Sequence, residues 1–378
     1  MIDIDRNRLI EIIKEIVNIP SEKPDGNEME VGHHIFTFLK NLGFAPIKQI
    51  VDEHSFNILC LIKGTSEGRA IMYNGHIDVV PAGNRELWSH DPYDCVERDG
   101  KLYGRGTCDM KGSVGCILYV AERIANGEID LAPDLLLTFT VDEENENKGI
   151  IQLIQSDINV DYCIIGEPTE LDIAIGHRGV STHYIELFGQ NCHIANSDGH
   201  RNAIHDAAKV IEWIEGKNTE LRRENSLIGY PQWKVTQVAG GIKSNVNPEY
   251  CKITADRRFI FGETKDSLIN DLELLKRTFP EMTIQYGLVS YVAPALEKES
   301  CRAVHDVQGA ILATEGKRHA VKEFEAGCEQ SFIQQKGIEC IVFGPGSLKQ
   351  AHVIDEFVSI TQLIDYVQII SALMGNPS

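Results

Sequence analysis

The sequence predicts an α/β domain with a mixed sheet, interrupted by an inserted α+β domain. The chain has 378 residues, more than a single core usually holds, so two domains are expected. Short apolar runs alternate with helical patterns at both ends of the chain, as in α/β domains, while the middle changes to alternating strand patterns. We therefore expect a discontinuous domain of residues 1–177 and 289–378, with residues 178–288 inserted.

Helical and strand patterns follow one another through the first part of the chain. Apolar residues recur at helical spacing in 5–18, 28–42 and 111–126, which predicts three amphipathic helices. Compact apolar runs predict strands at "FNILCLI" (56–62), "AIMYNG" (70–75), "LLLTFTV" (135–141) and "YCIIG" (162–166). Acidic and histidine residues gather where these strands end, which is where open α/β sheets place ligands.

The inserted segment has its own order of elements. A strand at "GVSTHYIELFGQ" (179–190) precedes a helix at "NAIHDAAKVIEWIEG" (202–216), and two strands follow at 233–241 and 249–260. A helix at 265–278 and a strand at 282–289 complete it. Strand, helix, strand, strand, helix, strand is the ferredoxin-like order, a complete small domain. Beyond it, "IECIVFGPG" (338–346) predicts a strand and 360–374 a last helix.

Composition excludes several classes of function. The 56 acids against 36 bases give a net charge of −20, and no dense Lys/Arg run is present, so nucleic-acid binding is not expected. No apolar run approaches the ~20 residues of a membrane span, so no membrane association is expected. The N-terminal stretch is an amphipathic helix pattern unlike a signal peptide, and the ten cysteines form no CxxC pair. We expect a cytoplasmic protein with reduced thiols.

Candidate metal ligands stand at the ends of the predicted strands. In "MYNGHIDVVPAG" (72–83), His76 and Asp78 are two residues apart at a strand end, so both side chains point to one face. Each further candidate alone is compatible with a cap, turn or loop role. Together they form a nitrogen and oxygen ligand set suited to zinc, cobalt or manganese. The further candidates are Asp109, Glu143, Glu144, Glu167 and His352.

The number and spacing of these carboxylates suggest two metals. Asp109 lies on a glycine-rich loop that allows close backbone approach, so it is the natural bridge between them. Side chains of the neighbouring Glu143 and Glu144 diverge, so one can bind metal while the other acts as general base. This is the division of labour that two-metal hydrolysis needs.

Two other motifs point to different chemistry and are rejected. "GTSEG" (64–68) fits the GxSxG pattern of serine hydrolases, but Ser66 lies between two strand patterns, which predicts a hairpin turn. "GRGTCDMKG" (104–112) lacks the spacing of a phosphate-binding loop, so no nucleotide site is expected.

Five stretches, in order along the whole chain, resemble the signatures of the zinc aminoacylase and carboxypeptidase family (M20-type metallopeptidases), which includes acetylornithine deacetylase and succinyl-diaminopimelate desuccinylase. They are "GHIDVVP", "LYGRGTCDMKG", "DEENENKG", "IIGEPTE" and "GPGSLKQAHVIDE". The second and fifth are most similar to the acetylornithine deacetylase branch. The resemblance implies a hydrolase of linear amide bonds that binds two Zn²⁺ ions. Co²⁺ or Mn²⁺ can take the place of Zn²⁺ in such a site.

The resemblance also implies a role for each ligand candidate. His76, Asp109 and Glu167 would hold one metal, and Asp109, Glu144 and His352 the other, with Asp109 and a hydroxide bridging. Glu143 would be the proton-shuttling base, and Asp78 would fix the imidazole of His76. A cis peptide bond would follow Asp109.

In the inserted domain the resemblance implies residues that handle the substrate. His193 in "FGQNCHIANSDGHRNAI" matches a histidine that reaches the partner subunit's active site and polarises the scissile carbonyl, which implies a homodimer formed through a lid and dimerisation domain. Asn245 and Arg258 match positions that bind the substrate's carboxylate. "EAGCEQSFI" (325–333) departs from the loop of many relatives, which argues against succinylated substrates.

The leading hypothesis is therefore an N-acyl amino acid deacylase, with N-acetylornithine as the favoured substrate and arginine biosynthesis as the setting. A metal-bridging hydroxide would attack the amide. A dipeptidase, carboxypeptidase or desuccinylase of the same family is the alternative, and a non-catalytic metal-binding protein is the alternative from a different class.

Overall fold

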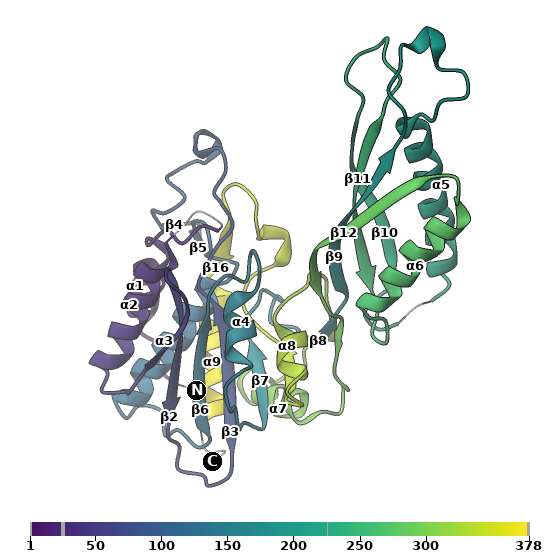
Figure 1. Cartoon of the computed structure of the whole chain (residues 1–378). Helices are drawn as coiled ribbons and strands as arrows, with labels where there is room; N and C mark the ends of the chain where they lie inside the picture. Colours follow the sequence, from purple (N-terminus) through teal and green to yellow (C-terminus); the bar gives the residue numbers. More distant parts are fainter. Residues whose placement is uncertain (1, 24–26, 225, 376–378) are drawn as a thin grey trace. The chain divides into compact units, whose positions relative to one another are not determined.

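A computed structural model describes residues 2–23, 27–224 and 226–375, which form two compact units (Figure 1). The first unit comprises Met1–Gly176, Glu297–Phe324 and Cys328–Ser378, and the second comprises His177–Leu296 and Glu325–Gly327. The predicted insertion, 178–288, lies inside the second unit. In the described part of the chain, no helix has the length and apolar character needed to cross a membrane.

A mixed sheet forms the centre of the first unit. Its strands lie in the order β1-β2-β6-β3-β7-β15-β8, and β14 also pairs with β8. β3 runs parallel to both β6 and β7, and β7 runs parallel to β15, whereas β2 is antiparallel to β1 and β6. The strands are β1 (Ile47–Asp52), β2 (Ser55–Ile62), β3 (Ala70–His76), β6 (Asp134–Thr140), β7 (Tyr162–Ile165), β8 (Ile173–His177), β14 (Val321–Phe324) and β15 (Glu339–Val342).

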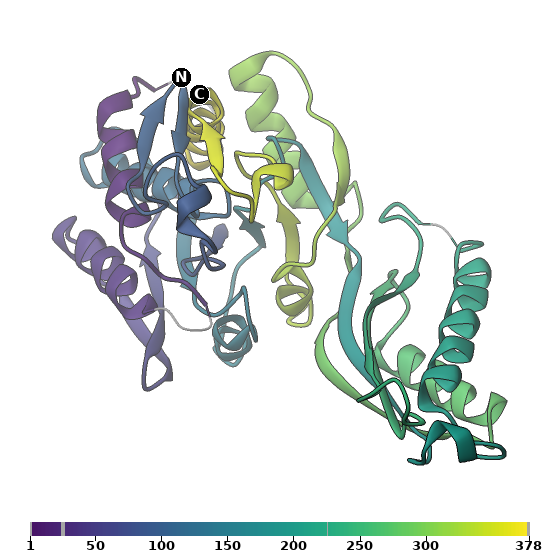
Figure 2. The same ribbon diagram turned by 90° about the horizontal axis from the view of Figure 1, so that it is seen from above.

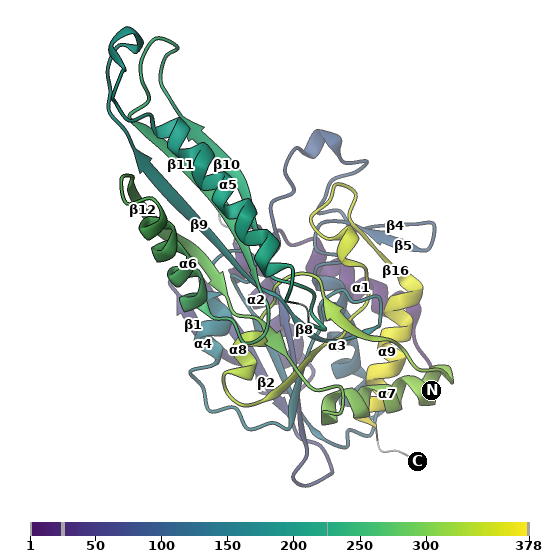
Figure 3. The same ribbon diagram turned by 90° about the vertical axis from the view of Figure 1, so that its right-hand side faces the viewer.

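Helices cover both faces of this sheet (Figures 2 and 3). α3 packs against α1 and α9, and α9 against α7, while α2 and α4 pack on β2. The central strands β3 and β7 are buried along almost their whole length because both faces are covered. The helices are α1 (Arg6–Val17), α2 (Glu28–Asn41), α3 (Lys111–Ala125), α4 (Lys148–Leu153), α7 (Arg302–Glu315), α8 (Gln330–Gln334) and α9 (Ile360–Met374). A small sheet of β4 (Val96–Arg98), β5 (Lys101–Tyr103) and β16 (Phe357–Ser359) completes the unit.

The second unit has the ferredoxin-like order of elements. β9 (Gly179–Phe188), α5 (Ala203–Leu221), β10 (Gln232–Gly240), β11 (Tyr250–Phe259), α6 (Lys265–Thr278) and β12 (Thr283–Val292) follow one another, and a short β13 (Ala295–Leu296) ends the unit's main segment. The antiparallel sheet has the order β10-β11-β9-β12. Alternate residues of β9 and β11 are buried against a core that includes α5 and α6. The predicted fold class is therefore confirmed.

The predicted hairpin at Ser66 is wrong. β2 and β3 are not partners, because β6 lies between them and pairs with both. The connection instead passes the start of β6, where Gly64 N donates to Asp134 Oδ1 (2.9 Å) and Ser66 N to the carbonyl of Ala132 (2.8 Å). Ser66 still lacks the strand-to-helix elbow of a serine hydrolase.

A buried glutamate ties α8 to the parallel part of the sheet. Glu329 directly precedes α8 and is 1% exposed. Its Oε2 accepts hydrogen bonds from Asn74 Nδ2 on β3 and from Thr140 Oγ1 on β6, the latter at 2.9 Å. Burial raises the pKa of Glu329 to about 7, and these hydrogen bonds only partly oppose the shift.

This buried carboxyl predicts a pH dependence of stability. Because the folded pKa lies above the ordinary value of 4.5, the contribution of Glu329 is fully present below pH 4.5 and is lost as the pH rises through about 7. In Glu329→Gln, the free energy of unfolding should fall less over this pH range, by up to about 3 kcal/mol. Urea unfolding of chelator-treated protein at pH 5 and pH 7.5 measures it. Glu53→Gln, at a side chain 85% exposed, is the control, and an unchanged pH slope in Glu329→Gln would contradict the assignment.

Candidate metal centre

Parallel strands bring the candidate ligands of the first unit to one edge of the sheet. His76 ends β3, Glu143 and Glu144 follow β6, and Glu167 follows β7. Since these three strands run parallel and are neighbours, their carboxyl ends lie side by side. Asp109 reaches the same edge from the loop before α3, after which the Asp109–Met110 peptide bond is cis, as the family resemblance implied.

Asp109 faces two histidines with its two carboxylate oxygens. Its Oδ1 lies 3.1 Å from His76 Nε2, and its Oδ2 lies 3.3 Å from His352 Nε2. His76 Nε2 also lies 3.5 Å from Glu167 Oε1, and His352 Nε2 lies 3.0 Å from Glu144 Oε1. All five predicted ligands are thus linked in one cluster, with Asp109 at its centre.

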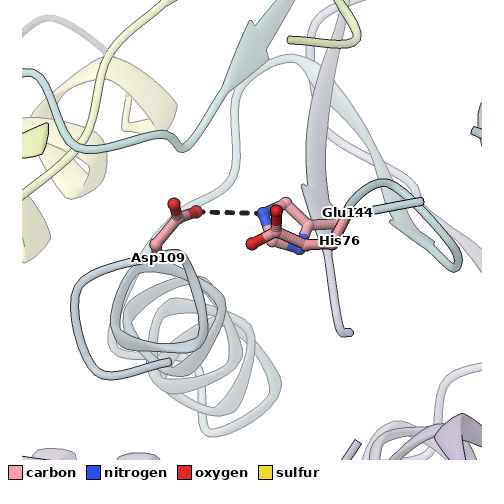
Figure 4. Close-up of side chains that lie close together, drawn as sticks. All are labelled: His76, Asp109 and Glu144. Carbon is pink, nitrogen blue, oxygen red and sulfur yellow. Dashed lines mark hydrogen bonds and ion pairs between the residues drawn. The ribbon is translucent and has the colours of Figure 1, made fainter. Parts of the chain in front are cut away.

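Figure 4 shows the middle of this cluster. The Asp109 carboxylate, at the start of α3, points toward the imidazole of His76, and the Glu144 carboxylate lies beside that ring. One ligand atom from each of these three residues lies within 4.8 Å of the others. This spacing is compact enough for the three side chains to share one cation.

Asp78 organises the site in a way that the sequence did not indicate. His76 Nδ1 lies 3.0 Å from the backbone carbonyl of Asp78, whereas the Asp78 carboxylate is 3.6 Å away. A carbonyl can only accept, so Nδ1 donates to it, and Nε2 is the nitrogen that faces Asp109 and would bind a metal on losing its proton. The buried carboxylate of Asp78 instead accepts from the backbone N–H groups of Glu143 (3.2 Å) and Glu144 (3.0 Å).

The charges of the cluster are unbalanced. Burial and neighbouring acids raise the pKa of Glu143 well above its usual value and that of Glu167 to about 8, and burial also raises the pKa of Glu144. Burial lowers the pKa of both histidines. Contacts with Asp109 nevertheless raise the pKa of His76 well above 6.5, and contacts with Asp109 and Glu144 raise that of His352 to about 10. The two histidines outweigh burial and lower the pKa of Asp109.

A cation fits this arrangement. Among the described residues, no lysine or arginine forms an ion pair with any of the five ligand side chains. The two histidines face only part of this buried carboxylate charge, so a bound cation would relieve the remaining repulsion. Imidazole nitrogens and carboxylate oxygens without thiolate are donors for zinc, cobalt or manganese. The side chains present therefore fit the metals that the sequence predicts.

The other predicted site residues, His193, Asn245 and Arg258, belong to the second unit. His193 Nδ1 accepts from the N–H of Ala195 (3.1 Å), and Asn245 lies next to this segment, its carbonyl accepting from Ile194 N at 3.0 Å. Asn245 Oδ1 is buried and has no hydrogen-bond partner within the described ranges. Arg258, on β11, pairs with Asp256 at 2.8 Å and has a side chain 31% exposed.

Two buried acids of the first unit, Glu329 and Glu356, could not be predicted to support the site from their residue type alone. Glu329 lies within "EAGCEQSFI" and Glu356 at the end of "GPGSLKQAHVIDE", two stretches that the sequence comparison with the family singles out for other reasons. Both are 1% exposed or less. Only their partners, on strands and loops far away in the sequence, show that they support the site.

Residues 72–376 match the family described as Peptidase family M20/M25/M40. Acetylornithine deacetylase of Photorhabdus laumondii is 30% identical to the chain over 383 residues, covering 97% of this chain and 96% of the relative. N-formyl-4-amino-5-aminomethyl-2-methylpyrimidine deformylase of Bacillus subtilis is 26% identical over 401 residues, covering 97% and 93%.

The fold has close counterparts among solved structures. A tripeptidase from Staphylococcus aureus superimposes with a TM-score of 0.82 at 18% identity, covering 99% of this chain and 98% of that one. The family match extends over most of the chain and includes every candidate ligand. The chain therefore belongs to the M20 peptidase family, a family of metal-dependent hydrolases that act on amide bonds.

Proposed function

We propose that the chain removes a short acyl group from an N-acyl amino acid, with two divalent metals at the centre built around Asp109. The observation that carries this proposal is the position of the two Asp109 oxygens, which face different histidines. His76, Asp109 and Glu167 would hold one metal, and Asp109, Glu144 and His352 the other. Zinc suits this ligand set, and cobalt or manganese can replace it.

When bound, the metals would polarise the amide carbonyl and lower the pKa of the attacking water. Glu143 is proposed to move the protons. Its backbone is held by the Asp78 carboxylate, and its neighbour Glu144 is a ligand, so its own side chain is left for the attacking water. Glu143 takes a proton from that water and delivers it to the departing amine nitrogen.

The second unit would supply groups that recognise the substrate. His193 is proposed to polarise the carbonyl from the partner subunit of a homodimer that forms through this unit. Asn245, through its Nδ2 donor, and Arg258 are proposed to bind the amino acid's carboxylate. Arg258 binds Asp256 through Nε, and within the described residues no hydrogen bond engages its terminal nitrogens, which are proposed to bind the ligand.

N-acetylornithine is the favoured substrate, supported by the 30% identity to the acetylornithine deacetylase. An N-formyl aminopyrimidine is the second candidate, because the deformylase is also similar along 97% of the chain. These candidates differ in one recognisable group, since only the amino acid carries a carboxylate. Dipeptides and succinylated amino acids are alternatives with the same chemistry. A non-catalytic metal-binding protein is disfavoured because Glu143 and every ligand are present.

Glu143→Gln should lower kcat by about 10²- to 10⁴-fold, since an amide cannot accept the water's proton. Metal content, measured by elemental analysis of the purified protein, should stay unchanged, because Glu143 is not among the proposed ligands. Glu146→Gln changes a glutamate of the same loop whose side chain is 60% exposed, and it should keep full activity. Substantial turnover in Glu143→Gln would remove Glu143 from its role.

Amine release from a panel of substrates tests the substrate class. Zinc- or cobalt-supplemented protein should act on N-acetylornithine, and should lose activity with EDTA and regain it when metal is returned. The panel includes the N-formyl aminopyrimidine, N-succinyl-diaminopimelate and dipeptides. Faster turnover of one of these would replace the substrate and keep the mechanism, whereas activity that survives complete metal removal would contradict the two-metal proposal.

Arg258→Gln should raise KM for a carboxylate-bearing substrate by about 10- to 100-fold, because a charge-assisted hydrogen bond is lost. Steady-state kinetics with N-acetylornithine measure this effect. The N-formyl aminopyrimidine is a matched control without a carboxylate, so any turnover of it should keep its KM. An unchanged KM for N-acetylornithine would show that Arg258 does not bind its carboxylate.

A further inference from the structure

Glu356 is a fully buried carboxylate, and in the described part of the chain its side-chain hydrogen bonds all come from the Asp109 loop. It stands directly before β16 and is 0% exposed. Its Oε1 accepts hydrogen bonds from the backbone N–H groups of Gly106 (3.1 Å), Cys108 (2.9 Å) and Asp109 (3.1 Å). Its Oε2 accepts from Arg105 Nη1 at 2.6 Å. One side chain therefore satisfies four donors of the segment that presents Asp109.

The loop depends on such an acceptor. Converging N–H groups form an anion-binding concavity, and buried N–H groups without an acceptor are strongly unfavourable. Gly106 has φ 85°, and a Cβ atom there would lie 2.7 Å from Val79 Cγ1, so the loop is also packed too closely to rearrange freely. The conformation of the loop thus requires the carboxylate of Glu356 as an acceptor.

Glu356 also joins the two segments that carry proposed ligands. It lies four residues after His352, and its own backbone carbonyl accepts from Gly104 N at 2.9 Å. The chain around His352 is thereby anchored to the chain around Asp109 by backbone and side chain together. His352 Nε2 and Asp109 Oδ2, which these two anchored segments carry, lie 3.3 Å apart.

We propose that Glu356 is a positioning residue of the metal centre. Its carboxylate sets the distance between Asp109 and His352, and with it the affinity for the metal that these two residues hold with Glu144. Arg105 supports this role by binding Oε2, which leaves Oε1 to the three N–H groups. The inference rests on the proposed two-metal function, and Glu356 acts through Asp109 without touching the reacting atoms.

Co²⁺ binding to the metal-free full chain tests this role without measuring activity. Glu356→Gln keeps the side-chain shape but turns one acceptor oxygen into an NH₂ donor, which must face either Arg105 or the three N–H groups. Wild-type protein should bind two Co²⁺ ions. In the variant, the dissociation constant of one ion should rise by about 10- to 100-fold, and the visible absorption spectrum of bound Co²⁺ should change.

Glu263→Gln is a matched control in the second unit. Glu263 also pairs with a buried arginine, Arg257, at 2.6 Å, and it also accepts from a backbone N–H, that of Ile260, at 2.8 Å. Loss of this pair should lower the thermal midpoint but leave the Co²⁺ affinity and spectrum unchanged. A shift in Co²⁺ affinity equal to that of Glu356→Gln would assign the effect to general destabilisation and overturn the proposal.

Glu356→Asp provides a second variant that keeps the charge and moves the carboxylate back by one methylene. It should weaken binding of one Co²⁺ ion in the same direction, so the test stands if Glu356→Gln fails to fold. A folded variant of either kind that binds both ions with wild-type affinity and spectrum would overturn the positioning role. Fewer than two Co²⁺ ions on wild-type protein would instead overturn the metal centre on which it rests.

Discussion

The burial of many carboxylates at one edge of a sheet is the constraint on which the first unit depends. Asp78, Asp109 and Glu167 are all less than 10% exposed, and each would repel the others in a dry environment. The structure meets this with two kinds of partner. Backbone N–H groups bind the carboxylates of Asp78 and Glu356, the latter together with Arg105, while imidazoles face the acids proposed to bind metal.

The parallel strands and the close packing of loops follow from that constraint. Ligands that come from three strands can meet only if the strands are neighbours and end at the same edge, which the order β6-β3-β7 provides. The loops must then approach one another closely. At Gly166, one residue before Glu167, a Cβ atom would lie 2.4 Å from Tyr73 Oη, so no larger residue fits without displacement. The site is thus set by backbone approach as much as by the ligands themselves.

Local patterns in the sequence predict what is local in the structure. The position of acids after apolar runs and the helical periods of the N-terminal segment depend on neighbours within a few residues, and the structure has these elements where the patterns place them. Ordered family motifs added the prediction that the ligands are divided between two metals. Strand pairing is different, because nothing in "FNILCLI" or "AIMYNG" shows that a strand more than sixty residues later will lie between them. Glu356 is hidden for the same reason, since its partners are about 250 residues away.

The two units divide the chemistry in a way that explains why the substrate is the hardest feature to infer. Every proposed metal ligand and the base lie in the first unit, whose geometry depends on strand order, glycine loops and buried acids that tolerate little change. The residues proposed to recognise the substrate lie on the second unit, where Arg258 is partly exposed and paired with only one acid. A substitution at such a position alters binding without disturbing the metal centre. Since one methylene in a pocket changes binding by only about 1–3 kcal/mol, relatives with the same centre can act on different amides.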